Sequence, residues 1–138
     1  MKKYLIILVL LLFCILLRVA LGGGTCPYER PEDTAYHKIT AEQAKEMIDK
    51  DDVTIVDVRT KEEYAEKHIP GAVLLPNESI GEEPPAELPD KDAVLLVHCR
   101  TGVRSKEASD KLVALGYTKV YDFGGIADWP YETESEEK

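Results

Sequence analysis

The sequence predicts an α/β fold in which helices cover both faces of a parallel sheet. Segments with strand character alternate with segments of helical periodicity along residues 37–131, and such alternation is typical of βαβ units. The strand-like segments are also apolar almost throughout, as strands buried on both faces are. With 138 residues, the chain fits one folded domain.

Two capping boxes mark the first helices. Thr40 is followed three residues later by Gln43, and Thr60 by Glu63. In each box the threonine side chain bonds the backbone N–H of the later residue, whose side chain bonds the N–H of the threonine. The expected elements of this half are a helix over 41–50, a strand over 53–58, a helix over 61–67 and a short strand over 72–75.

One amphipathic helix dominates the second half of the domain. Ala108, Leu112 and Leu115 recur on one helical face, and Gly116 follows as a C-terminal cap. The expected elements are an irregular loop over 77–88, a strand over 93–98, a helix over 103–115, a strand over 119–123 and a turn around Trp129. Residues 132–138 form an acidic tail, which we expect to be disordered and solvated.

The N-terminal segment 1–22 has the pattern of a signal peptide or membrane anchor. Lys2 and Lys3 precede a short apolar run that ends in small residues, and this order is typical of secretory signals. We therefore expect an exported, extracytoplasmic protein that is periplasmic, secreted or at the cell surface. Cleavage, retention as an anchor and lipidation at Cys26 all remain open, and residues 23–36 are interpreted as a linker.

Charge and cysteine content exclude several classes of protein. The net charge of −9 argues against nucleic-acid binding, which needs a basic surface. No cysteine and histidine have zinc-site spacing, so we expect no metal site. Export would permit a disulfide between Cys26 and Cys99, but nothing in the sequence places the two together. Membrane contact is expected only through the N-terminal segment.

Cys99 is the candidate nucleophile. It follows the strand predicted over 93–98, and ligands bind beyond the carboxyl ends of strands in parallel sheets. The helix predicted from Val103 leaves its first N–H groups unpaired, and a loop containing Gly102 can turn its own N–H groups inward. These groups favour the thiolate, so we expect a lowered pKa for Cys99.

The residues that follow Cys99 supply positive charge and hydrogen-bond donors. The expected substrate-binding residues are Arg100, Thr101, Gly102, Val103 and Arg104. The two arginines would bind an anionic substrate and also favour the thiolate, and the Thr101 hydroxyl could donate to the sulfur. Each arginine could instead point into solvent.

The segment from Cys99 to Arg104 is short for a cysteine phosphatase loop. Cysteine phosphatases place the arginine one residue later, in a loop sized for tetrahedral phosphate, and Ser105 occupies that position here. The tighter loop favours attack on a sulfur donor and retention of a persulfide.

Several motifs resemble those of the rhodanese (thiosulfate sulfurtransferase) family and occur in the family's order. They are Asp57-Val58-Arg59, Glu63-Tyr64, His68-Ile69-Pro70-Gly71-Ala72, the loop Cys99-Arg100-Thr101-Gly102-Val103-Arg104-Ser105, and Gly124-Gly125-Ile126-Ala127-Asp128-Trp129. Any one of these motifs would be weak evidence for the family, but together they extend over nearly all of the predicted domain 37–131.

The resemblance implies a single three-layer α/β/α domain with a five-stranded parallel sheet. It also implies that Cys99 takes sulfur from a small anionic donor such as thiosulfate, or from a persulfide, and passes it to cyanide or a thiol without a cofactor. Asp57, Arg59 and His68 are expected to support the site. The first two would tie the rim of the sheet together, and His68 would be a structural hydrogen-bonding residue.

Two other functions remain open on the sequence alone. The chain could be a persulfide carrier or thiol redox relay that acts on a protein thiol partner, or a noncatalytic binding module. Turnover of thiosulfate and cyanide that is lost in Cys99→Ala would separate a sulfurtransferase from a binding module.

Overall fold

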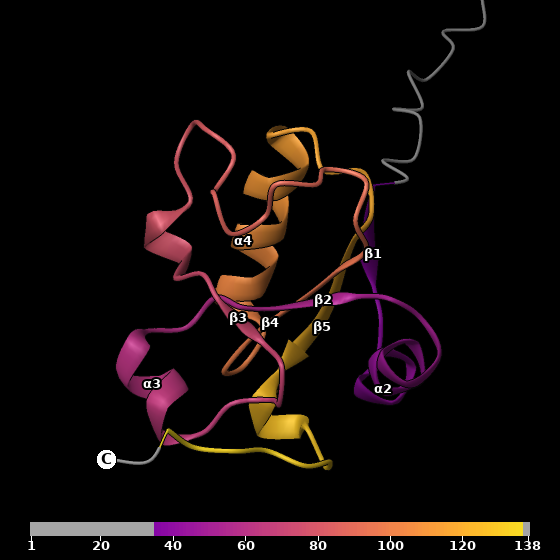
Figure 1. The fold of residues 1–138 in the computed structure, drawn as a ribbon, viewed down its shortest axis with the longest axis vertical. Coiled ribbons are helices and arrows are strands. Elements are labelled where there is room, and N and C mark those ends of the chain that lie inside the picture. The colour runs from indigo at the N-terminus through magenta and orange to yellow at the C-terminus, as the bar shows by residue number, and fades with distance from the viewer. Residues whose placement is uncertain (1–34, 137–138) are drawn as a thin grey trace, which may run out of the picture. The chain divides into compact units, whose positions relative to one another are not determined.

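The computed structural model describes residues 35–136, which form a parallel sheet flanked by helices (Figure 1). The strands are β1 (Tyr36–Lys38), β2 (Thr54–Asp57), β3 (Val73–Leu74), β4 (Leu95–Cys99) and β5 (Val120–Gly125). They lie in the order β1-β5-β4-β2-β3, and each neighbouring pair is parallel. The expected five-stranded parallel sheet is confirmed. The predicted signal or anchor over 1–22 and Cys26 lie outside the described residues.

Three α-helices and two short 3-10 turns surround the sheet in this part of the chain. They are α2 (Ala41–Lys50), α3 (Lys61–Glu66), α4 (Val103–Ala114), η1 (Asn77–Ser79) and η2 (Ile126–Asp128). Figure 1 shows α4 and α2 on opposite sides of the strands. No helix among residues 35–136 is long and apolar enough to cross a membrane.

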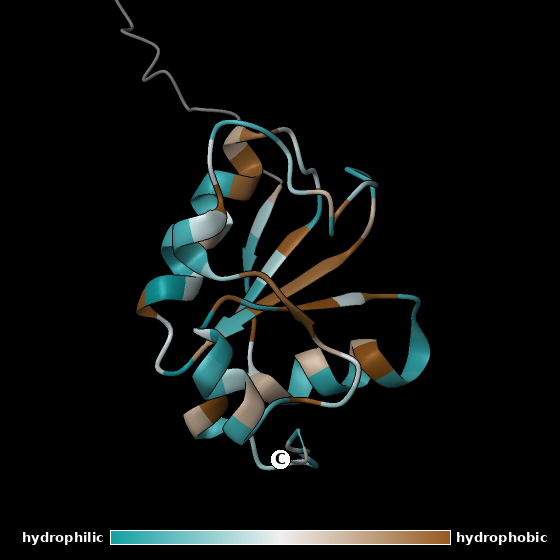
Figure 2. Cartoon of the chain, turned by 60° about the vertical axis from the view of Figure 1, so that its left-hand side comes forward, coloured by the Kyte–Doolittle hydropathy of each residue, from teal (hydrophilic) through white to brown (hydrophobic). Residues whose placement is uncertain are grey.

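The central strand β4 divides its side chains between two hydrophobic cores. Leu95 and Val97 pack with Leu112 of α4, whereas Leu96 packs in a second cluster with Ala44 of α2. Successive strand residues point to opposite faces, and every residue of β4 is buried. The sheet is therefore covered on both faces, which confirms the three-layer prediction. In Figure 2 the most hydrophobic strand segments lie between the helices, and the helices carry long hydrophilic stretches.

Both predicted capping boxes are present. Gln43 N–H donates to Thr40 Oγ1 at 3.2 Å, and Thr40 N–H donates to Gln43 Oε1 at 2.9 Å. The corresponding distances between Thr60 and Glu63 are 3.3 and 3.1 Å. These bonds fix the residues at which α2 and α3 begin, and they hold the Glu63 side chain at the start of α3.

The strand β1 was not expected from the sequence. Tyr36, which we placed at the end of the linker, pairs instead with Val120, and Lys38 pairs with Asp122. Three residues are too few to show a hydrophobic period. The strand forms because β5 offers an edge of backbone groups that need partners.

The acidic tail is not wholly disordered, contrary to our expectation. Glu134 pairs with His68 in an antiparallel bridge whose two backbone N–H···O distances are 2.8 Å. The N–H of Glu136 donates to the carbonyl oxygen of Ala65 at 3.0 Å. The His68 ring lies 3.1 Å from the Glu134 carboxylate and stacks on Tyr64. His68 thus has a structural position, in which it holds the tail against α3.

Candidate active site

The loop between β4 and α4 wraps around the sulfur of Cys99. Gly102 precedes α4 with a φ of 103°, a left-handed conformation that glycine adopts without strain. Its N–H donates to Cys99 Sγ at 3.0 Å. No side chain caps the start of α4, so the first N–H groups of the helix remain available to the sulfur. The side chains of Thr101 and Val103 are exposed.

Backbone N–H groups of this loop favour the thiolate of Cys99. Burial raises the thiol pKa, and Cys99 is 1% exposed. The backbone N–H groups of Ser105, Gly102 and Thr101, which point toward the sulfur, outweigh burial and lower the pKa of Cys99. The shift of the Cys99 pKa has the expected direction, and the Thr101 residue contributes through its backbone N–H and not through its hydroxyl.

Because Gly125 has no side chain, the cysteine loop can lie directly against the end of β5. A Cβ at Gly125 would lie 2.1 Å from the carbonyl oxygen of Arg100. That oxygen accepts a hydrogen bond from Ala127 N–H at 3.2 Å. The pairing of β4 with β5 shifts register between Val97 and Cys99, an irregularity that often re-aims side chains beside active sites. The end of β5 therefore supports the cysteine loop directly.

Asp122 anchors helix α4 beneath the loop. The Ser105 hydroxyl donates to Asp122 Oδ1 at 2.8 Å, and Gly124 N–H donates to the same oxygen at 2.9 Å. The Tyr36 hydroxyl and the Lys38 ammonium each lie 3.2 Å from the carboxylate, which is 1% exposed. A buried carboxylate needs such partners. We did not assign Asp122 from the sequence, although a charged residue inside a buried strand is a signal for such a site.

The two loop arginines differ in their partners. Both terminal nitrogens of Arg104 donate to the Glu63 carboxylate, at 2.8 and 3.0 Å. This pairing with Arg104 lowers the pKa of Glu63 from 4.5 to about 2. Hydrogen bonding to Glu63 likewise raises the pKa of Arg104, and the charge of Cys99 adds a smaller contribution. Arg100 is exposed and lines the pocket described below.

Asp57 and Arg59 form a buried ion pair at the rim of the sheet. Arg59 donates to the Asp57 carboxylate through Nη2 at 2.6 Å and Nε at 2.9 Å. The same Nη2 donates to the Lys67 carbonyl oxygen at 2.6 Å, so the pair ties the end of β2 to the end of α3. His98 lies 3.7 Å from Asp57. Burial lowers the pKa of His98, so its ring is neutral at neutral pH.

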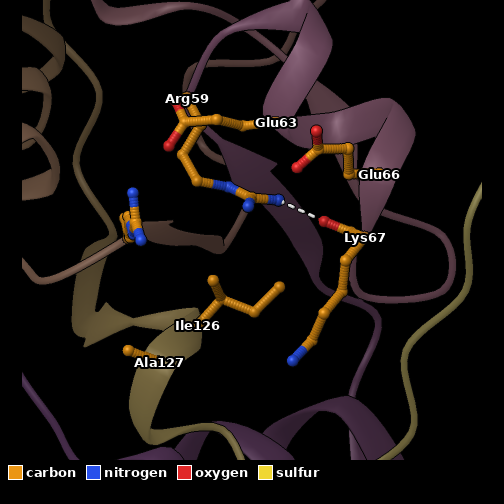
Figure 3. Close-up of a pocket in the computed structure, with 7 residues that line it drawn as sticks. Arg59, Glu63, Glu66, Lys67, Ile126 and Ala127 are labelled. Atoms are coloured by element: carbon orange, nitrogen blue, oxygen red, sulfur yellow. Dashed lines mark hydrogen bonds between the residues drawn. The ribbon is translucent and has the colours of Figure 1, made fainter.

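A pocket of about 340 Å³ lies between α3 and η2, beside the cysteine loop. Figure 3 shows Arg59 reaching into this pocket, with Ile126 and Ala127 on the opposite wall. The lining residues are Arg59, Glu63, Glu66, Lys67, Arg100, Ile126 and Ala127. Charged groups thus face an apolar wall, as is typical of small-molecule sites. No three His, Cys, Asp or Glu side chains within residues 35–136 cluster as metal ligands.

The fold and the loop define a class of protein. It is an α/β domain that holds a cysteine of lowered pKa at the carboxyl ends of its parallel strands. The family model described as rhodanese-like domain matches residues 40–131. The chain belongs to this family, and the resemblance seen in its motifs is confirmed.

Individual relatives agree with this assignment. Thiosulfate sulfurtransferase PspE of Escherichia coli (strain K12) is 36% identical over 73 residues, which are 53% of this chain and 70% of that protein. Thiosulfate sulfurtransferase GlpE of Coxiella burnetii (strain RSA 331 / Henzerling II) is 35% identical over 95 residues, or 68% and 87% of the two chains. A crystal structure of a rhodanese-like domain protein from Staphylococcus aureus matches with a TM-score of 0.64 and 33% identity. It covers 72% of this chain and 98% of that one.

Proposed function

We propose that this chain is an exported sulfurtransferase that moves sulfane sulfur through a persulfide on Cys99. The donor is thiosulfate or a persulfide, and the acceptor is cyanide or a thiol. Membership of the rhodanese-like family supports sulfur transfer in general. The proposal rests above all on the hydrogen bond from Gly102 N–H to the Cys99 sulfur at 3.0 Å, because it favours the thiolate that the reaction needs.

In the first step the Cys99 thiolate attacks the outer sulfur of thiosulfate. A bond forms between the two sulfurs, the sulfur–sulfur bond of the donor breaks, and sulfite leaves with the bonding electron pair. Arg100 lies on the pocket wall, where its charge can attract the anionic donor. Because Cys99 is 1% exposed, the donor must approach it with its terminal sulfur first.

In the second step the acceptor attacks the outer sulfur of the persulfide. Cyanide becomes thiocyanate, or a thiolate becomes a new persulfide, and Cys99 leaves as the thiolate with which the cycle began. The N–H groups that lower the pKa of the Cys99 thiol also stabilise the negative charge of the persulfide, as preorganised donors do elsewhere. The two half-reactions predict ping-pong kinetics.

Intact-mass measurement tests the persulfide directly. After incubation with thiosulfate, the reduced protein should gain the mass of one sulfur atom, and cyanide should remove it as thiocyanate. Cys99→Ser should show neither change. A folded, reduced wild-type protein that gains no sulfur from thiosulfate or from an organic persulfide would contradict the proposal.

Export is supported by the sequence pattern of residues 1–22. Expression of the full chain in a bacterial host, followed by fractionation and mass analysis of the N-terminus, tests it. We expect the protein outside the cytoplasm, and the mass separates signal cleavage, a retained anchor and lipidation at Cys26. Full-length protein that stays free in the cytoplasm would contradict export.

A second candidate function is sulfur delivery to a protein partner. Val103 at the start of α4 is 75% exposed, and Arg100 and Thr101 beside it are also exposed. An apolar side chain at the mouth of the loop fits a contact with another protein. A carrier should pass sulfur to a reduced dithiol protein such as a thioredoxin with a higher kcat/KM than to dithiothreitol. Equal values for the two acceptors would argue against this role.

A further inference from the structure

We propose that Glu63 determines donor specificity by occupying Arg104, so that the site favours singly charged sulfur donors over doubly charged thiosulfate. The favoured class comprises organic persulfides and thiosulfonates, in which one negative charge is attached to an organic group. This inference rests on the proposed function, because it concerns which donor delivers sulfur to Cys99.

The geometry leaves Arg104 little capacity for a second anion. Its two terminal nitrogens both donate to Glu63, at 2.8 and 3.0 Å. The side chains of Arg104 and Glu63 are only 29% and 24% exposed, so the pair is partly shielded from water. A two-pronged pair between guanidinium and carboxylate is among the stronger polar contacts in proteins. An anionic donor would have to displace a carboxylate to use Arg104.

Glu63 is also held in place independently of Arg104. Its Oε2 accepts a hydrogen bond from the N–H of Thr60 at 3.1 Å, as part of the capping box of α3. The carboxylate is therefore ordered on its own helix before it meets the guanidinium. An ordered partner loses little conformational entropy on pairing, which makes the pair harder for a small anion to disrupt.

With Arg59 and Arg104 paired, the remaining charges of the pocket cancel once the Cys99 thiolate is counted. Arg59 is paired with Asp57, as Arg104 is with Glu63. The other charged lining residues are Glu66, Lys67 and Arg100. None of these three forms an ion pair within residues 35–136. Two cations face one carboxylate and the Cys99 thiolate, so no net positive charge is left for a donor with two negative charges.

A donor with one negative charge loses less hydration on entering such a site than doubly charged thiosulfate does. The second charge of thiosulfate would lose water without gaining a partner, which is unfavourable. Ile126 and Ala127 form the apolar wall of the pocket, and they offer contact to the organic group of a thiosulfonate. In that reaction the Cys99 thiolate attacks the outer sulfur, and a sulfinate leaves with the electron pair of the broken sulfur–sulfur bond.

The test compares thiosulfate with the methanethiosulfonate anion as donors to Glu63→Gln. Glutamine fills the same capping position in α2, where Gln43 bonds Thr40, so α3 should still form. The rate of persulfide formation on Cys99, followed by intact mass, gives kcat/KM for each donor. We expect the ratio of thiosulfate to methanethiosulfonate to rise about tenfold, the value of one charge-assisted hydrogen bond. Intrinsic donor reactivity cancels when this ratio is compared between variants.

Two further variants separate the release of Arg104 from a general change in charge. Glu66→Gln removes the same charge from the same pocket but leaves Arg104 paired, and it should shift the ratio by less than about threefold. Adding Arg104→Gln to Glu63→Gln should cancel the rise in the ratio of thiosulfate to methanethiosulfonate. An unchanged ratio in Glu63→Gln, or an equal gain in Glu66→Gln, would overturn the inference. If neither donor loads wild-type Cys99, the proposed function itself fails.

Discussion

The Ser105 hydroxyl lies 2.8 Å from the Asp122 carboxylate and joins α4 to β5 beneath the cysteine loop. The backbone N–H of the same residue contributes to the lowered pKa of the Cys99 thiol. Since Asp122 is held by three further groups from β1 and β5, the position of Ser105 is fixed by the sheet and not by the loop.

Replacement of Ser105 by alanine is expected to raise the pKa of Cys99. The lost hydrogen bond, of about 1 kcal/mol, is the one to Asp122 that holds the start of α4 beside the sulfur, and its loss should slow persulfide formation at neutral pH about fivefold. The pH dependence of iodoacetamide alkylation measures the shift. Ser109→Ala is the matched control, because Ser109 is buried on the same helix and its hydroxyl has no partner within residues 35–136. Identical alkylation profiles for Ser105→Ala and wild type would contradict this role.

The lowered pKa of Cys99 predicts a pH-dependent contribution to stability. When the folded pKa lies below the unfolded one, ionisation stabilises the fold above the unfolded pKa, and this gain is lost as the pH falls through the folded pKa. Urea unfolding of wild type and Cys99→Ser across that pH window should therefore show stability of the wild type rising more steeply with pH. Parallel curves would mean that the thiol is not perturbed.

The Glu63–Arg104 pair predicts a second pH range, in acid, over which the stability of the fold changes. The pKa of Glu63 is lowered from 4.5 to about 2, so its stabilising effect is present above 4.5 and is lost as the pH falls toward 2. The wild type should exceed Glu63→Gln in unfolding free energy by about 1 kcal/mol near neutrality, a value reduced for partial solvent exposure. The difference should vanish at the acidic end, and a constant difference would count against the pair as its source.

Replacement of Gly125 by alanine should displace the cysteine loop. The added Cβ would lie 2.1 Å from the Arg100 carbonyl oxygen, so backbone must shift, at a cost of about 2 kcal/mol. We expect a lower unfolding free energy and little persulfide formation. Gly81→Ala is the control, because a Cβ at Gly81 meets nothing within 4 Å. A fully active Gly125→Ala protein would show that the loop does not depend on this contact.

Features specified by neighbouring residues could be predicted from the sequence. The capping boxes at Thr40 and Thr60 act over three positions, and they correctly located the starts of α2 and α3. The cysteine loop is also local, since the hydrogen bond to its sulfur comes from Gly102. For this reason the expected direction of the Cys99 pKa shift agrees with the structure.

Features specified by distant residues could not be predicted in this way. Glu63 and Arg104 are 41 positions apart, and nothing in either segment shows that their side chains meet. The bridge between His68 and Glu134 spans 66 positions, and the acidic composition of the tail pointed to solvation instead. The strand at Tyr36 depends on an edge that β5 provides. Each of these is a consequence of tertiary packing.

Because the Arg100 carbonyl lies so close to Gly125, the cysteine loop and the end of β5 depend on each other although they are distant in sequence. If this cysteine loop were grafted onto another protein, its N–H groups would point at the sulfur only if that protein had a glycine at the position of Gly125. A side chain in place of that glycine would push the Arg100 carbonyl away and carry the nucleophile with it.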